Sequence, residues 1–207
     1  MASGEDENTY LKKSKCDSRI KEKILQEPMA TDWEGGNYNP YRLVTVEEGS
    51  DEYDVVENLF DETSRGLTIT QVKRVENPYL LGQYLMKKEK MARKRLFVDE
   101  RLLFHGTRES NVDGICRFNF DWRRNGQSTG HKFGQGVSFT PEVSYARHYT
   151  SGENVFFLVK VLVANSTIGN ASSIIPPPDY DTTENVYGTV IVKYEDDDFY
   201  PQYLIYA

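Results

Sequence analysis

The chain has 207 residues, 38% of them hydrophobic and 13% aromatic, which is enough to bury one sizeable core. Its formal net charge of −7 argues against binding to a nucleic-acid backbone through the whole surface. The longest uncharged apolar run, "NVFFLV", is far shorter than the roughly 18 residues of a membrane span, and the N-terminus lacks the apolar stretch of a secretory signal. We therefore expect an intracellular protein, cytoplasmic or nuclear, with no membrane partner.

Residues 1–36 are polar and charged and predict a flexible or loosely docked extension, whereas 37–207 form the expected domain. The segment "YRLVTVEE" alternates as a strand does. The next segment, "SDEYDVVENLFDETSRG", predicts a helix with Ser50 as N-cap and Gly66 at its end. Its expected apolar stripe consists of Tyr53, Val56, Leu59 and Phe60.

A second strand is predicted at "LTITQVKRV", followed by a second helix over 77–96 with Asn77 as cap and Pro78 at the first helical position. Five inward-facing residues are expected in this helix: Leu80, Leu81, Tyr84, Leu85 and Met91. The helix ends in the basic run "KKEKMARKR", which we interpret as a solvated face. No aromatic residue interrupts this run, so nucleic-acid binding is not expected there.

A third strand, "LLFH", ends in turn chemistry at Gly106, and short helices are predicted near 109–115 and over 141–149. The apolar segment "NVFFLVKVLV" lacks alternation, which is typical of a strand buried on both faces. The closing segments "GTVIVKY" and "YPQYLIYA" are too close for a crossover helix, so we expect them to pair or lie side by side. This order of elements predicts an α+β fold with an antiparallel-rich sheet.

The spacing of residues argues against several common metal-binding, nucleotide-binding and catalytic motifs. Cys16 and Cys116 form no paired ligand motif, so neither a disulfide framework nor a zinc site is expected. The segment "GQGVSF" lacks the third glycine of a dinucleotide fingerprint, and Thr140 stands where a nucleophile elbow around Ser138 needs glycine. No phosphate loop, HExxH or EF-hand pattern occurs.

The remaining chemical signal lies in His105 with Gly106, in the glycine pair Gly134 and Gly136, and in Tyr149. A histidine can hydrogen-bond a sugar hydroxyl, a glycine lets a ligand approach bare backbone, and the ring of a tyrosine can stack on a flat ring. Together they suit a nucleotide or nicotinamide pocket. If each residue is considered alone, a structural role remains an alternative to ligand binding. The histidine could be a structural residue, the glycines could form turns, and the tyrosine could belong to the core.

The segments "LLFHGT", "VDGICRFNFD", "FGQGVSF", "SYARHY", "FFLVKVLV" and "YPQYLIYA" resemble, in unbroken order, the catalytic domain of the poly(ADP-ribose) polymerase family. The resemblance is to its mono-ADP-ribosylating branch, which includes the dioxin-inducible and zinc-finger antiviral members. It implies an ADP-ribosyltransferase fold, a split antiparallel sheet with flanking helices, that holds NAD+ as substrate without a metal. It also implies that His105 binds a ribose hydroxyl, Gly106 the nicotinamide carboxamide, and Tyr149 the nicotinamide ring.

Three positions depart from the family pattern. Val190 falls where chain-elongating members have a glutamate, so transfer of a single ADP-ribose to a protein acceptor, which could be the chain itself, is expected. Ser138 replaces a tyrosine that covers the other side of the nicotinamide pocket, and Ala146 replaces a serine that hydrogen-bonds the carboxamide. Both changes remove contacts with NAD+.

Three interpretations follow from these residues. The first is an NAD+-dependent mono-ADP-ribosyltransferase with a rearranged nicotinamide pocket. The second is a catalytically silent pseudoenzyme that keeps the fold as a binding module, and the third is a structural or nucleic-acid-associated accessory that uses the basic helix.

Overall fold

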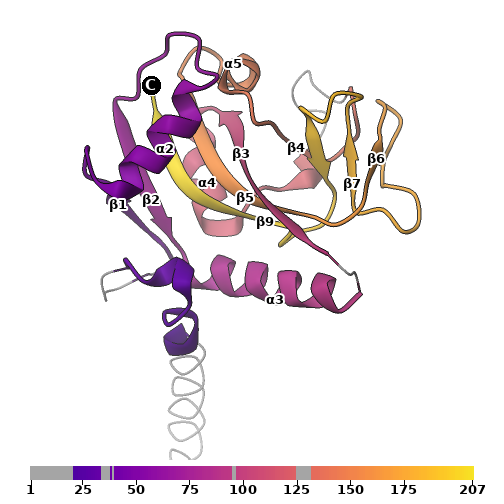
Figure 1. Ribbon diagram of the computed structural model, residues 1–207, viewed down its shortest axis with the longest axis horizontal. Coiled ribbons are helices and arrows are strands. Elements are labelled where there is room, and N and C mark those ends of the chain that lie inside the picture. Colours follow the sequence, from indigo (N-terminus) through magenta and orange to yellow (C-terminus); the bar gives the residue numbers. More distant parts are fainter. Residues whose placement is uncertain (1–20, 34–37, 39, 95–96, 125–131) are drawn as a thin grey trace, which may run out of the picture.

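The computed structural model describes residues 21–33, 38, 40–94, 97–124 and 132–207. Within these residues the strands form two sheets that lie next to each other (Figure 1). The large sheet has the order β1-β2-β9-β5-β3, and the small sheet has the order β4-β8-β7-β6. The expected α+β class with a split sheet is confirmed.

All neighbouring strands of the large sheet are antiparallel. Its strands are β1 (Arg42–Thr45), β2 (Gln71–Glu76), β9 (Phe199–Tyr206), β5 (Val155–Val163) and β3 (Asp99–Thr107). The small sheet is made of three-residue strands, and its β6–β7 pair is parallel. These strands are β4 (Val137–Phe139), β8 (Ile191–Lys193), β7 (Thr182–Glu184) and β6 (Ser166–Ile168).

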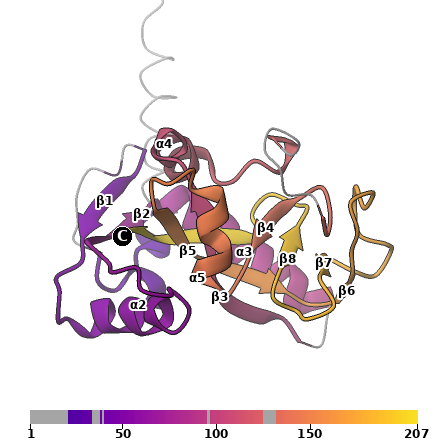
Figure 2. The same cartoon turned by 90° about the horizontal axis from the view of Figure 1, so that it is seen from above.

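Helices cover both faces of the large sheet. Seen from above, α2 (Asp51–Asp61) and α4 (Glu109–Phe118) lie on opposite sides of its strands (Figure 2). The longest helix of the described residues, α3 (Pro78–Lys94), crosses one end of the sheet (Figure 1). Further helical elements of the described residues are η1 (Pro28–Ala30), η2 (Trp122–Arg124), α5 (Val143–Ala146) and η3 (Arg147–Tyr149).

The capping residues expected from the sequence are confirmed. The Ser50 side chain accepts a hydrogen bond from the Tyr53 amide at the start of α2. The Asn77 side chain accepts from the amides of Tyr79 and Leu80, and Pro78 occupies the first position of α3. These bonds satisfy donors that a helix start otherwise leaves open.

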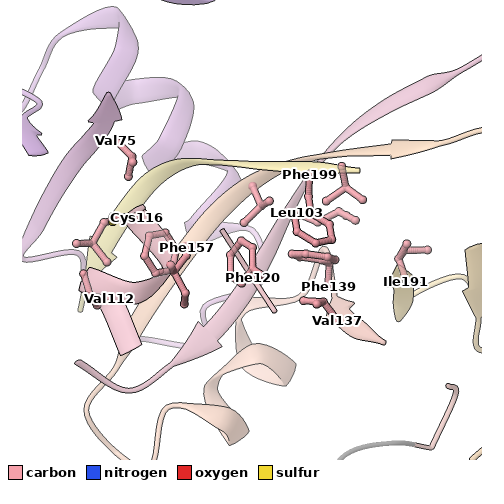
Figure 3. Packing of buried hydrophobic residues seen from close by; sticks show 14 of the residues in the cluster. Val75, Leu103, Val112, Cys116, Phe120, Val137, Phe139, Phe157, Ile191 and Phe199 are labelled. Carbon is pink, nitrogen blue, oxygen red and sulfur yellow. The ribbon is translucent and has the colours of Figure 1, made fainter. Parts of the chain in front are cut away.

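Strand β5 is buried on both faces, as its continuous apolar sequence predicts. Phe157 and Val159 belong to the cluster under α4, whereas Phe156 and Leu158 belong to the cluster under α2. The cluster under α4 continues to the small sheet through Phe120, Phe139, Phe199 and Ile191 (Figure 3). One apolar core therefore fixes the position of β4 against the large sheet.

The two closing strands neither pair nor lie side by side, so that prediction is wrong. Strand β8 pairs with β4 and β7, whereas β9 pairs with β2 and β5. Residues 194–198 carry the chain from one sheet to the other. The buried Lys193 forms ion pairs with Asp198 (3.2 Å) and Asp181 (2.8 Å), and Lys87 of α3 reaches Asp198 as well. These contacts hold the crossing in place.

The predicted end of the first helix is also wrong. Helix α2 ends at Asp61, and Gly66, at φ +89°, lies in the turn beyond it. Thr63 explains the early end, because its hydroxyl donates to the Pro141 carbonyl (3.3 Å) and accepts from the Val143 amide (2.9 Å). The chain leaves the helix there to hold the start of α5.

The described part of the predicted extension, residues 21–33, packs on the protein. Ala30 and Trp33 are buried in the cluster that contains Leu81 of α3, and the Asp32 carbonyl accepts from the Arg74 guanidinium. Residues 1–20, including Cys16, and 34–37 lie outside the described residues. The division into 1–36 and 37–207 stays a prediction.

The basic run of helix α3 forms ion pairs with acidic residues of the protein. Lys87 pairs with Glu195, Lys88 with Glu100, and Arg93 with Glu89. Much of the positive charge of this run therefore has an acidic partner. Among the described residues, no helix is both long and apolar enough to cross a bilayer.

Candidate functional site

A cavity of about 730 Å3 opens where the edge of the large sheet meets the small sheet. Its wall is formed by the end of β3, the start of α4, the loop after α4, strand β4, and α5 with η3. Of the residues singled out in the sequence, Gly134 and Val190 do not line it, and the other six do: His105, Gly106, Gly136, Ser138, Ala146 and Tyr149. Segments more than 40 positions apart in the chain thus meet at one place.

His105 is held in one orientation by the strand opposite it. Its Nδ1 lies 3.0 Å from the Ser138 carbonyl oxygen, which can only accept, so Nδ1 carries the proton. The ring packs against Phe120 and Phe139, with centroids 4.8 and 5.8 Å away. Burial lowers its pKa, against an opposing effect of the Ser138 hydrogen bond, so the ring is neutral at pH 7. The Nε2 atom of a neutral ring with this tautomer is a hydrogen-bond acceptor.

The backbone of Gly106 faces the cavity side of β3. The Phe104 amide and carbonyl both bond to Thr140, away from β5. Because backbone groups alternate along an antiparallel strand, the amide and carbonyl of Gly106, two residues on, point to the same edge. A Cβ at this position would lie 2.0 Å from the Ala146 carbonyl oxygen, so only glycine allows α5 to pack this closely.

Tyr149 closes the cavity from η3 and is paired with Tyr145 of α5. The Tyr149 hydroxyl donates to the Tyr145 hydroxyl at 3.3 Å, and the ring centroids lie 5.9 Å apart. Burial, followed by this hydrogen bond, raises the pKa of Tyr149, so its hydroxyl stays protonated. The pair is a neutral aromatic surface at one side of the cavity.

Ser138 and Val190 lie on the same face of the small sheet. Ser138 of β4 is the register partner of Val192 of β8, and Val190 precedes Val192 by two residues. Side chains of cross-strand partners and of alternate residues share a face. Val190 is only 3% exposed, because it packs in a cluster with Val192 and Tyr194 that Tyr145 and Phe133 cover. The position that resembles the glutamate site is therefore screened from the cavity.

Ala146 and Gly136 have packing constraints of their own. Ala146 is 1% exposed and belongs to the core cluster under α2. A Cβ on Gly136 would lie 2.2 Å from the Lys193 carbonyl oxygen, so glycine is required for β4 to pair with β8. Both residues line the cavity, and neither brings a side-chain polar group to it.

Sequence reasoning did not single out Tyr145, Phe118 or Trp122, which also line the cavity. Tyr145 precedes Tyr149 by four residues, a helical spacing that places both on one face and could have revealed it. Phe118, at the end of α4, is 79% exposed, and Trp122 lies four residues further on, at the start of η2. Nothing in the sequence pattern distinguishes these two rings from core residues.

The described residues contain no cluster of three or more histidine, cysteine, aspartate or glutamate side chains placed to hold a metal ion. The expectation that no metal takes part stays a prediction.

The cavity and the two sheets define an ADP-ribosyltransferase-type catalytic domain. A family model described as the poly(ADP-ribose) polymerase catalytic domain matches residues 50–203, more than half of the chain. The chain therefore belongs to the poly(ADP-ribose) polymerase family, and the domains of this family use NAD+ as substrate.

Named relatives support the mono-ADP-ribosyltransferase branch. The chain is 35% identical over 179 residues to protein mono-ADP-ribosyltransferase PARP12 of Homo sapiens, a match covering 80% of this chain and 25% of that protein. It is 30% identical over 213 residues to protein mono-ADP-ribosyltransferase PARP11 of Mus musculus, covering 86% and 64%. It is also 27% identical over 110 residues to zinc finger CCCH-type antiviral protein 1 of Mus musculus, covering 53% and 11%. The chain thus spans less than two thirds of each of these relatives.

Proposed function

We propose that this chain transfers one ADP-ribose unit from NAD+ to a protein acceptor and releases nicotinamide. The observation that carries the proposal is the 3.0 Å contact of His105 Nδ1 with the Ser138 carbonyl oxygen, which leaves Nε2 as the acceptor nitrogen of a residue that lines the cavity together with Gly106 and Tyr149. Its acceptor could be a second protein or the chain itself.

Each of these groups has one role in the proposed reaction. His105 Nε2 accepts a hydrogen bond from a ribose hydroxyl, the Gly106 amide and carbonyl bond to the carboxamide, and Tyr149 stacks on the nicotinamide ring. The bond from ribose C1′ to nicotinamide breaks, and nicotinamide leaves as a neutral molecule with the electron pair. The acceptor's nucleophilic atom forms the new bond to C1′, and any proton it carries passes to solvent.

Positioning supplies much of the rate in this proposal, because a dinucleotide held at a ribose hydroxyl and at nicotinamide presents C1′ to the acceptor. Val190 provides no carboxylate to activate a hydroxyl of an attached ADP-ribose. The proposed product is therefore a single unit and not a polymer.

A second function, a binding module without activity, is favoured by two residues of the cavity wall, Ser138 and Ala146. Ser138 places no ring over the cavity, and the methyl group of Ala146 cannot hydrogen-bond the carboxamide. Losing one neutral hydrogen bond costs about 1 kcal/mol, and losing a stacked ring costs a similar amount or more. A loss of this size weakens NAD+ binding by about tenfold or more.

Incubation of the full chain with NAD+ labelled in the adenylate part separates these two functions. We expect label on the chain or on proteins of a lysate, in single ADP-ribose units, with nicotinamide released in equal amount. The absence of label and of nicotinamide release would refute the transferase. Binding of NAD+ measured by calorimetry in that case would support the binding module.

A further inference from the structure

We infer that Tyr145 supplies the aromatic wall on the nicotinamide side of the cavity that Ser138 does not provide. This inference rests on the proposed function, since it assigns a positioning and specificity role within the same site.

The position of Tyr145 relative to the small sheet is the first observation. Its ring packs on the cluster formed by Val190, Val192 and Tyr194. Val192 is the cross-strand partner of Ser138, and the Cβ atoms of such partners lie about 5 Å apart. Tyr145 therefore covers the sheet face next to Ser138, and both residues line the cavity.

The contact between Tyr145 and Tyr149 is the second observation. The rings are inclined by 52° at a centroid distance of 5.9 Å, and the two hydroxyls share a hydrogen bond. A tyrosine that stacks on nicotinamide needs a fixed ring plane. Tyr145 fixes this plane from α5 and extends the aromatic surface from Tyr149 to the small sheet.

The backbone explains why this wall comes from α5. The Gly106 Cα packs directly under the Ala146 carbonyl, which leaves no room for any larger residue at position 106. The neighbouring Tyr145 is thereby anchored to the edge of the large sheet at one end and to the small-sheet cluster at the other. An anchored ring contributes to binding at a low entropic cost, because little freedom remains to be lost.

The test compares two ligands that differ in the nicotinamide ring: ADP-ribose and an NAD+ analogue whose C-glycosidic bond cannot be cleaved. In Tyr145→Ala we expect the dissociation constant of the analogue to rise roughly tenfold, while that of ADP-ribose changes by less than about twofold. Calorimetry measures both. The control is Tyr79→Ala on the exposed face of α3, 58% exposed and outside the cavity, which should change neither.

Each outcome separates this inference from the proposed function. Equal weakening of both ligands by Tyr145→Ala would indicate a general loss of structure and would overturn the inference, as would an unchanged affinity for the analogue. Failure of the wild-type chain to bind either ligand would refute the proposed function itself.

A reciprocal variant sharpens the assignment. Introduced alone, Ser138→Tyr should tighten analogue binding by about threefold or less, because Tyr145 already supplies the aromatic wall. Introduced together with Tyr145→Ala, it should tighten binding by roughly tenfold relative to Tyr145→Ala alone. Equal gains in both backgrounds would show that positions 138 and 145 act independently and would overturn the inference.

Discussion

The two sides of the cavity are built differently. On the large-sheet side, His105 and Gly106 lie in β3, which pairs with β5 through nine consecutive residue pairs and rests on core clusters on both faces. On the small-sheet side, Ser138 and Val190 lie in or next to strands of only three residues. His105 and Gly106, which match the family pattern, are on the first side, and two of the three departures, Ser138 and Val190, are on the second. The difference shows that His105 and Gly106 are backed by the core, whereas the small-sheet positions that resemble the second tyrosine and the glutamate of the family carry other residues.

The largest expected effect comes from the large-sheet side. His105→Ala removes the acceptor nitrogen, so we expect loss of transfer by at least about 100-fold, with a melting temperature lowered by only a few degrees. Label incorporation and calorimetric unfolding measure the two quantities. Unfolding of this variant at room temperature would mean that His105 serves the core and would remove the contrast between the two sides.

Val190→Glu tests the small-sheet side. The new carboxylate would be buried among Val192, Tyr194 and Tyr145, so we expect a loss of about 3 kcal/mol in the free energy of unfolding at pH 7.5 and no polymer formation. Burial raises the pKa of such a glutamate above its unfolded value of about 4.3, so the loss should shrink as pH falls toward that value.

Denaturant unfolding at pH 4.5 and 7.5, with Val190→Met as control, measures this dependence. A stable Val190→Glu variant that synthesises polymer would show that position 190 is open to the cavity.

The smallest expected effect concerns the pH dependence of stability. Burial lowers the pKa of His105, so the unfolded chain binds a proton there before the folded chain does. The stability of the wild-type chain should therefore fall as pH drops below about 6.5, the ordinary histidine value, and His105→Ala should lose less over the same range. Equal pH profiles for the two chains would contradict the neutral, Nδ1-protonated ring.

Local sequence determined the elements whose signals are complete within one segment. The N-caps Ser50 and Asn77, the helix start at Pro78 and the doubly buried strand β5 follow from side chains within a few residues of one another. The end of α2 and the separation of β8 from β9 do not. They depend on partners far along the chain, namely Pro141 for Thr63, β4 for β8, and β2 for β9.

For the site, the sequence by itself determined the residue types and, through the resemblance, the family. Only the tertiary structure decided that Ser138 orients His105 through its carbonyl, that Val190 is buried under Tyr145, and that Tyr145 joins Tyr149 to the small sheet. The physical reason is that these relations join residues that are either distant in the chain or on different faces of short elements. Hydrophobic periodicity and capping report only on neighbours, whereas the cavity is made where two sheets meet.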